Sequence, residues 1–385
     1  MRTIFIISPQ SWNHIFVSKH HYAVELAADK QAEVYYLSPP ENWRAVDLKV
    51  NKHDKYSNLH IVEYSYPFPF HLFLRYKIRP LYNFLMHIFL KRVLLKRLPI
   101  PDEVWVFDAN VYSDLSQFNA KTKIFFPVDS FEHSIAIKIA KSSSLIVTVS
   151  EMLMKPFSEL SIPKLLLHHG LASHFEITAK KNLEKLTDNS KELTEHINAC
   201  FFGNLLVPQI DHPTFKKIIQ DNRKVRFHFW GTYKANTSED TIDISNDFVS
   251  FLEGCSNVIL HGPVSSEDLC SNIQKMDCFI LCYNMNHQNK GNNSHKLMEA
   301  LSTGKVIITN YFPLFEQKRE LVVMPDDFCN DQLPELFCTT TEKLLFYNNT
   351  DLTHKRIRFA LENTYNSNLR NIYNALEKQM LLAKK

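Results

Sequence analysis

A short segment in the second half of the chain combines residue types that could bind a nucleotide diphosphate. Residues 288–310 read QNKGNNSHKLMEALSTGKVIITN, and His295, Lys296 and Glu299 lie within one helical turn of each other. On a helix, this spacing lets the three side chains share a face. Lys296 could hold a phosphate as a point charge, and Glu299 could accept hydrogen bonds from ribose hydroxyls. The alternative is an ordinary exposed lysine–glutamate pair on an amphipathic helix.

The residues around this segment predict where the helix begins and ends. Asn293 and Ser294 favour the N-cap, and Gly304 stands where a glycine commonly follows a helix. The strand-like run Val306–Thr309 comes directly afterwards. We therefore expect a helix over 295–303 that presents free N–H groups and a positive dipole end, which suits a pyrophosphate.

Two segments of the first half carry side chains that could act on an acceptor, meaning a substrate whose hydroxyl group receives a transferred group. Asp129 and His133 follow a strand-like run and are four residues apart, so either could orient or deprotonate an acceptor hydroxyl. Asp129 could instead cap the next helix. Trp12, Asn13 and His14 follow the first strand-like run, and we expect them on the acceptor side. Trp12 could stack on a sugar or an acceptor lipid, or pack locally.

Strand-like runs alternate with helical patterns along the chain, which predicts parallel α/β sheets. In the first half the runs are Thr3–Ser8, Glu33–Leu37, Glu103–Phe107, Lys123–Phe126, Leu145–Val149 and Lys164–His168. In the second half they are Ala199–Phe202, Val225–Trp230, Asn257–Leu260, Cys278–Cys282 and Lys305–Thr309. Ligands bind beyond the carboxyl ends of parallel strands. Gly231, Gly262 and Tyr283 stand at such ends and are candidates for binding the donor, meaning the substrate that supplies the transferred group.

These two series predict two Rossmann-like parallel-sheet domains facing each other across a cleft. The first would span residues 1–175 and the second residues 199–350. Residues 176–198 are rich in charge and poor in aromatic residues, so we interpret them as a linker, partly helical at most. Residues 351–385 show a long helical pattern, with apolar residues at Ile357, Leu361, Leu369 and Tyr373.

Composition excludes several classes of protein. The 385 residues contain seven glycines, none close enough to another for G-x-G, which excludes a dinucleotide fingerprint and a P-loop. The net charge is +3, so the chain as a whole is not built to bind a polyanion. Seven cysteines form no C-x-x-C pair, as expected for buried thiols in a reducing compartment. No run is long enough for a signal-peptide core or a bilayer span, so we expect a cytoplasmic protein.

One stretch of the first half is strongly basic. Residues 64–101 contain no Asp or Glu, and their bases lie among aromatic and aliphatic residues: Arg75, Lys77, Arg79, Lys91, Arg92, Lys96 and Arg97. This pattern is typical of membrane-surface binding, so residues 75–97 predict contact with anionic lipid. The alternatives are a basic outer helix pair without a partner and a nucleic-acid site, although no recognised nucleic-acid motif accompanies the charge.

The segment NNSHKLMEALSTGKVII resembles the donor-binding helix of GT-B glycosyltransferases, especially the bacterial enzymes of the large, mostly retaining family 4. Further segments match that family in order: Ile139–Glu151, His168–Phe175, Phe202–Asn204, Asn257–Val264 and Asp277–Tyr283. The resemblance implies a nucleotide-diphosphate sugar as donor, with Asn204 and Val264 added to its binding residues. It also implies that the helix of 351–385 returns to the first domain. The acceptor would be a saccharide or a lipid-linked molecule, in surface polysaccharide or glycolipid assembly.

The sequence departs from the family pattern at one informative position. The family's first glutamate would fall at position 291, which is Gly291, so Asn289, Asn292 or Asn293 would have to replace it. No Asp-x-Asp occurs, so we expect neither a metal nor a cofactor, and Lys296 with the helix dipole would stabilise the leaving diphosphate. A nucleotide-sugar 2-epimerase on the same fold and a non-catalytic nucleotide-sugar-binding protein remain alternatives.

Overall fold

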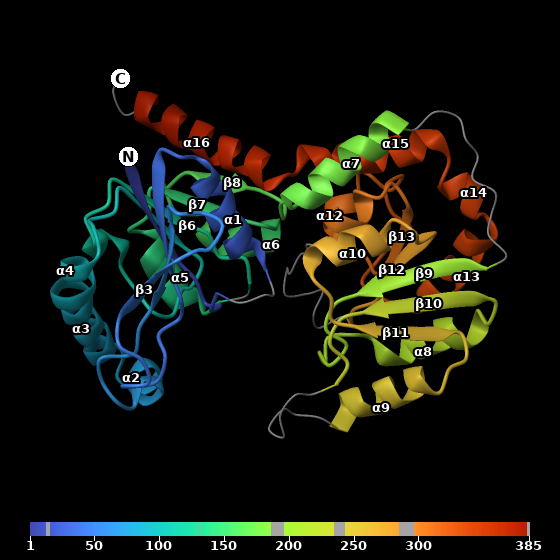
Figure 1. Cartoon of the computed structure of the whole chain (residues 1–385), viewed down its shortest axis with the longest axis horizontal. Coiled ribbons are helices and arrows are strands. Elements are labelled where there is room, and N and C mark those ends of the chain that lie inside the picture. Colours follow the sequence, from blue (N-terminus) through green and yellow to red (C-terminus); the bar gives the residue numbers. More distant parts are fainter. Residues whose placement is uncertain (13–15, 130, 186–195, 235–242, 285–295, 383–385) are drawn as a thin grey trace. The chain divides into compact units, whose positions relative to one another are not determined.

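The chain folds into two compact units, each built around its own parallel sheet (Figure 1). The computed structural model describes residues 1–12, 16–129, 131–185, 196–234, 243–284 and 296–382. Unit 1 comprises Met1–His168 together with Tyr365–Lys385, and unit 2 comprises His169–Thr364. The predicted α/β class with two parallel-sheet domains is confirmed.

Unit 1 contains a sheet in the order β3-β4-β2-β1-β5-β6-β7-β8, parallel throughout except for the β3–β4 pair. Its strands are β1 (Arg2–Ile7), β2 (Ala32–Leu37), β3 (Lys49–Lys52), β4 (Leu59–Glu63), β5 (Glu103–Val106), β6 (Thr122–Phe125), β7 (Leu145–Thr148) and β8 (Lys164–Leu166). All six strands predicted for this half are present. The two unpredicted strands are β4 and β3, and β3 is an exposed edge strand that begins and ends with a lysine and so lacks an apolar pattern.

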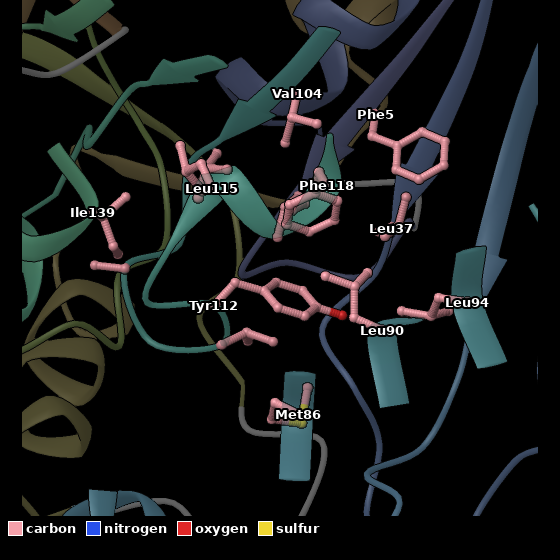
Figure 2. Packing of buried hydrophobic residues seen from close by; sticks show 14 of the residues in the cluster. Phe5, Leu37, Met86, Leu90, Leu94, Val104, Tyr112, Leu115, Phe118 and Ile139 are labelled. Carbon is pink, nitrogen blue, oxygen red and sulfur yellow. The ribbon is translucent and has the colours of Figure 1, made fainter. Parts of the chain in front are cut away.

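The helices of unit 1 are α1 (Ser18–Ala28), α2 (His71–Lys77), α3 (Arg79–Phe89), the π-helical η1 (Leu90–Leu94), α4 (Leu95–Arg97), η2 (Leu115–Phe118), α5 (His133–Ala140), α6 (Glu151–Met154), η3 (Lys155–Phe157) and α16 (Tyr365–Leu382). Those between α2 and η3 bury one large apolar cluster against this sheet. Figure 2 shows Met86, Leu90 and Leu94 from the α3–η1 segment in one cluster with Tyr112 and Phe118. Only one face of α3 therefore takes part in the core.

Unit 2 contains an all-parallel sheet in the order β11-β10-β9-β12-β13. Its strands are β9 (Ile197–Phe202), β10 (Val225–Trp230), β11 (Val258–Gly262), β12 (Cys278–Leu281) and β13 (Val306–Thr309), as predicted within a few residues. Its helices are α7 (Ser173–Lys185), α8 (His212–Asp221), α9 (Asp243–Glu253), α10 (Ser266–Ile273), α12 (Lys296–Leu301), η4 (Pro313–Phe315), α13 (Leu333–Glu342), α14 (Leu344–Tyr347) and α15 (Thr350–Glu362).

The segments that lead into and out of unit 2 differ in detail from the predicted boundaries. Residues 176–185, expected in the linker, continue α7, because Phe175 and Ala179 are spaced by four and both are buried. The helical pattern over 351–385 is two helices, α15 in unit 2 and α16 in unit 1. Within unit 1, α16 packs on α1, and Asn368 donates hydrogen bonds to the Tyr22 hydroxyl and the His168 carbonyl. The C-terminal helix therefore returns to the first domain.

Candidate functional site

Three glycines stand side by side at the carboxyl ends of neighbouring strands in unit 2. Gly203 follows β9, Gly231 follows β10 and Gly262 ends β11. Their φ angles are 141°, 134° and 78°, values that favour glycine. The Gly203 N–H donates to the Trp230 carbonyl at 2.8 Å, and the Gly231 N–H donates to the Gly262 carbonyl at 2.9 Å. The three strand ends thus form a continuous edge of main chain.

At two of its three glycines this edge has no room for side chains, whereas a Cβ atom at Gly262 would meet nothing closer than Tyr233 Cε1 at 3.8 Å. A Cβ atom added at Gly231 would lie 1.9 Å from the Gly203 carbonyl oxygen, a severe clash with backbone. A Cβ atom added at Gly203 would lie 2.4 Å from Cε and 2.7 Å from Nζ of Lys296. The lysine side chain therefore rests directly on the Gly203 backbone. We call Gly203, Gly231 and Gly262 the glycine edge.

Lys296, the first residue of α12, is held in place by Tyr283. Its Nζ donates to the Tyr283 hydroxyl at 2.8 Å and lies 5.5 Å from the centroid of that ring. Tyr283 is buried; its N–H donates to Asn310 Oδ1 at 3.1 Å and its carbonyl accepts from Asn330 Nδ2 at 2.9 Å. The sequence predicted Lys296 and Tyr283 but missed both asparagines. Asn310 directly follows β13, so the strand-end rule could have identified it.

Glu299 lies three residues beyond Lys296 on the same helix. Burial raises the pKa of its carboxyl group to about 8, against the opposing effect of the Lys296 ammonium. At neutral pH the carboxyl group is therefore mostly protonated and can donate as well as accept a hydrogen bond. A ligand that donates hydroxyl hydrogen bonds would favour its ionised form.

The far end of α12 is anchored inside unit 2. Gly304 has a φ of 77°, and a Cβ atom there would lie 2.4 Å from Thr353 Cγ2. The buried guanidinium of Arg356 donates to the Gly304 carbonyl at 3.1 Å and to the Leu321 carbonyl at 3.0 Å. Both the helix and its terminal glycine are confirmed. The anchoring fixes the axis along which Lys296 and Glu299 are presented.

The remaining donor-side candidates lie outside this constellation or outside the described residues. Asn204 is exposed, and its Oδ1 accepts the Leu206 N–H at 2.9 Å, which is a local turn contact. Val264 is exposed and follows the glycine edge by two residues. Asn293, Ser294 and His295 fall outside the residues that the structure describes, so their predicted roles stay predictions.

In unit 1, Asp129 follows β6 and lies near a buried lysine. The side chain of Asp129 is 65% exposed, and its Oδ2 lies 3.6 Å from Nζ of Lys19 in the first turn of α1. Burial lowers the pKa of the Lys19 ammonium, while Asp129 opposes that shift. Helix α5 has Glu132 at its N-cap, so Asp129 does not cap it, and His133 is exposed. The sequence missed Lys19, because a lysine at a helix start is usually in solvent.

Trp12 is half-buried in a ring of aromatic side chains. Its ring meets those of Phe16, His20, Tyr36 and His53 edge-on, with centroid distances from 4.9 to 5.3 Å. This arrangement favours the local-packing interpretation of Trp12. Asn13 and His14 lie outside the described residues. Within the part of the chain that the structure describes, no group of three or more His, Cys, Asp or Glu side chains could hold a metal ion.

Comparison with known proteins gives a fold. No protein-family model and no curated protein sequence matches the chain. An E. coli trehalose-6-phosphate structure bound with UDP-2-fluoro glucose is similar, with 11% identity and a TM-score of 0.68 over 97% of this chain and 98% of that chain. A UDP-forming α,α-trehalose-phosphate synthase from Burkholderia xenovorans is also similar, with 11% identity and a TM-score of 0.64 over 98% of this chain and 99% of that chain.

A sucrose-phosphate synthase from Thermosynechococcus elongatus is similar over the full length of both chains, with 10% identity and a TM-score of 0.67. Identities this low establish architecture rather than activity. The matches extend over both units. The chain therefore has the GT-B fold that its donor-helix segment resembles, with two Rossmann-like domains and a C-terminal helix in the first.

Proposed function

We propose that the chain is a glycosyltransferase that moves a sugar from a nucleotide-diphosphate sugar to a saccharide or lipid-linked acceptor. The observation that carries this proposal is the Lys296 ammonium resting on the glycine edge. A bare main-chain edge beside a fixed cation suits a diphosphate, because glycine lets a phosphate approach the main chain closely and the ammonium can pair with its charge. Solved structures of the same fold are described as UDP-forming or as bound with UDP-2-fluoro glucose, which supports a nucleotide sugar.

Each residue of the proposed site has a distinct role. Lys296 would neutralise the charge that develops on the departing diphosphate, and preorganised charge of this kind is usually the largest catalytic term. Glu299 would accept hydrogen bonds from ribose hydroxyls in its ionised form. Asp129, exposed at the end of β6, would orient or deprotonate the acceptor hydroxyl.

A thermal-shift screen against nucleotide sugars tests the donor assignment, because a ligand raises the melting temperature according to the ratio of its concentration to Kd. We expect at least one nucleotide-diphosphate sugar to stabilise the protein, and Lys296→Ala to lose that shift. Product analysis then separates the alternatives. Conversion of the donor alone to an epimer would indicate an epimerase, and tight binding without turnover for any acceptor would indicate a non-catalytic protein.

We also propose that the α2–α3 segment of unit 1 docks on an anionic membrane. Among the residues that the structure describes, no helix is both long and apolar enough to cross a bilayer. However, α2 and α3 leave large apolar side chains in solvent, with Phe70, Phe73, Tyr76 and Phe84 exposed by 57–78%. The bases Lys77, Arg92, Lys96 and Arg97 are exposed nearby in sequence. Exposed aromatic residues combined with positive charge are typical of a surface that binds lipid headgroups and inserts shallowly.

This docking would place the enzyme at the cytoplasmic face of a membrane, where surface polysaccharides and glycolipids are assembled. Sedimentation with vesicles tests it. We expect binding that needs anionic lipid, weakens with salt and is lost in a Phe73→Ser, Phe84→Ser variant. Phe346→Ser is the matched control, because Phe346 is a similarly exposed phenylalanine in unit 2. Equal sedimentation with neutral and anionic vesicles would contradict the proposal.

A further inference from the structure

Two arginines at the junction of α2 and α3 are half-buried without a carboxylate partner. Arg75 and Arg79 are four residues apart, and each lies close enough to affect the other's charge. Within the described part of the chain, neither forms an ion pair within 4 Å. Burial lowers the pKa of the Arg79 guanidinium, which marks an environment unfavourable to its charge. Partly buried cations of this kind usually have a counter-ion.

Arg79 is fixed at the carboxyl edge of the unit 1 sheet. Its Nε donates to Asn83 Oδ1 at 3.1 Å, and its Nη2 donates to the Asn110 carbonyl at 2.8 Å. Asn110 lies four residues beyond the end of β5. Because ligands of parallel sheets bind at this edge, the guanidinium lies where a ligand is expected and not on a remote surface.

Hydrogen-bond donors at this place are left without acceptors. Nε of Arg75 and the hydroxyl of Tyr82 are buried, and neither has a hydrogen-bond partner of ordinary geometry among the described residues. Tyr82 is fully buried, its ring lies 5.0 Å from the Arg79 guanidinium, and the Tyr66 hydroxyl lies close to both Tyr82 and Arg75. Buried donors without well-formed hydrogen bonds are rare in folded proteins, and here the Tyr66 hydroxyl is the only neighbour within reach of both Arg75 and Tyr82 among the described residues.

The nearby carboxylates do not supply that acceptor. Asp108 and Glu132 are within electrostatic range of Arg79. However, Asp108 Oδ1 accepts the Asn110 N–H at 2.7 Å, and Glu132 Oε1 accepts the Ser134 hydroxyl at 2.7 Å. Burial also raises the pKa of Asp108. Each carboxylate accepts a hydrogen bond from another group, and among the described residues neither forms an ion pair with these arginines. Arg75 Nη2 donates to the Tyr76 hydroxyl at 2.7 Å, so only the donors that the two arginines do not use within the fold remain for an outside anion.

We propose that Arg75 and Arg79, with the rings of Tyr66 and Tyr82 packed behind them, form a binding site for a phosphoryl group carried by the acceptor. Guanidinium groups suit this ligand because their planar donor forks match phosphate oxygens. The inference rests on the proposed glycosyltransferase function only in assigning the phosphoryl group to the acceptor; the binding of phosphate itself does not depend on that function. The phosphoryl group could belong to a sugar phosphate or to a lipid headgroup, and both present the same oxygens to the site.

Calorimetric titration of the full chain tests the site, with inorganic phosphate and glucose 6-phosphate as soluble probes and glucose as the uncharged control. Vesicles of phosphatidylglycerol in phosphatidylcholine probe the lipid source. The variants are Arg75→Gln and Arg79→Gln. Arg92→Gln is the matched control, because Arg92 is an exposed arginine in the same basic segment. We expect Arg75→Gln and Arg79→Gln to weaken phosphate binding by about tenfold or more, with Arg92→Gln unchanged.

The two sources give different results. A loss confined to glucose 6-phosphate and phosphate supports a soluble phosphorylated acceptor, and a loss confined to vesicles beyond that of Arg92→Gln supports a lipid headgroup. Equal binding by all three variants in both arms would overturn the site, as would a wild-type chain that binds none of these probes. Nucleotide-sugar binding, measured in parallel, reports on the proposed function alone and should be unchanged.

Melting temperatures with and without phosphate distinguish a binding site from a merely structural role of these arginines. If the two guanidiniums repel each other without a ligand, Arg75→Gln should leave the melting temperature unchanged or raise it in phosphate-free buffer, and should lose the rise that phosphate produces in the wild type. Arg75 makes no hydrogen bond to main chain among the bonds the structure records, so this variant is the safer of the two. A melting temperature lowered in phosphate-free buffer, with the phosphate-induced rise intact, would contradict the proposal.

Discussion

The carboxyl edges of the two sheets differ in what they expose, which is main chain in unit 2 and polar side chains in unit 1. In unit 2 the edge is main chain, with Gly203, Gly231 and Gly262 at neighbouring strand ends and one lysine resting on them. In unit 1 the corresponding edge carries large polar side chains, among them Lys19, Asp129 and Arg79. All seven glycines of the chain lie between positions 170 and 304, which is within unit 2, and unit 1 has none.

This difference separates a general binding surface from a selective one. A bare main-chain edge allows close approach, and a single cation pairs with a diphosphate whatever is attached to it, so a glycine edge suits a donor. Side-chain forks and carboxylates recognise particular groups at particular angles, so an edge built from them suits an acceptor that varies between enzymes. Substitutions in the two units should therefore have opposite effects on binding. Unit 2 should be sensitive to added side chains, and unit 1 to removed ones.

The largest expected effect comes from removing the Asp129 carboxylate in unit 1. If it acts on the acceptor hydroxyl, Asp129→Asn should lower kcat by roughly 10²–10⁴, with nucleotide-sugar binding unchanged. Steady-state kinetics with a working acceptor would measure this. Glu132→Gln is the matched control, since it removes an exposed carboxylate three residues away. An Asp129→Asn enzyme with normal kcat, or a larger loss in His133→Ala, would move the role away from Asp129.

The next effect tests the opposite rule in unit 2. Gly231→Ala adds one methyl group, which would meet the Gly203 carbonyl oxygen at 1.9 Å at a φ of 134°. The free energy of unfolding should fall by roughly 3 kcal/mol, and nucleotide-sugar binding should be lost with the edge. Gly254→Ala is the control, because a Cβ atom there meets nothing closer than 3.5 Å. Chemical denaturation of both variants would show whether the glycine edge tolerates a side chain.

Much of the fold could be predicted because its signals are local. Runs such as Ile4–Ile7 are buried, so their apolar composition predicts a strand without reference to the rest of the chain. Strand ends then identified Gly231, Gly262 and Tyr283, since a parallel sheet collects all its carboxyl ends on one edge. Helix α12 was predicted for the same reason, since Gly304 marks its end in the sequence itself.

The parts that the sequence could not predict depend on contacts between distant segments. Asn330 donates a hydrogen bond to the Tyr283 carbonyl, which lies 47 residues away in sequence, and no local sequence pattern predicts that bond. Lys19 and Arg79 are ordinary basic residues in sequence, and only the surrounding loops bury them. The basic stretch was interpreted as one exposed face, whereas Arg75 and Arg79 are half-buried within it. Charge alone does not tell an exposed base from an enclosed one.

A smaller effect is expected from the cation on the glycine edge. Lys296→Ala removes one charge-assisted contact, so nucleotide-sugar affinity should weaken by roughly 1.5–3 kcal/mol while the fold stays intact. Lys275→Ala, which removes an exposed lysine of the same unit, should have no effect. Calorimetric titration would measure both. Unchanged affinity in Lys296→Ala would contradict the donor site proposed at the glycine edge.

The smallest effect concerns the pH dependence of unit 2. The pKa of the Glu299 carboxyl is about 8 in the folded chain and ordinarily 4.5. The unfolded chain therefore loses this proton first, so the contribution of Glu299 to stability is fully present below pH 4.5 and is lost as the pH rises towards 8. The slope should be at most about 1.4 kcal/mol per pH unit, and less because Glu299 keeps part of its surface in water. Glu299→Gln should lack this component of the slope in denaturation measured at several pH values.

Donor binding provides a second way to measure the protonation of Glu299. If ribose hydroxyls donate to the ionised carboxylate, binding at pH 7 must displace the proton that Glu299 carries in the empty site, and affinity should rise between pH 6.5 and 8.5. Calorimetry in two buffers of different ionisation enthalpy would detect the proton released. Glu299→Gln should bind without releasing it, and its affinity should be flat over this range. Proton release that persists in Glu299→Gln would assign the proton to another group. A wild-type affinity that falls with pH would mean that the protonated carboxyl is the form that binds, with Glu299 acting as a donor to the ligand.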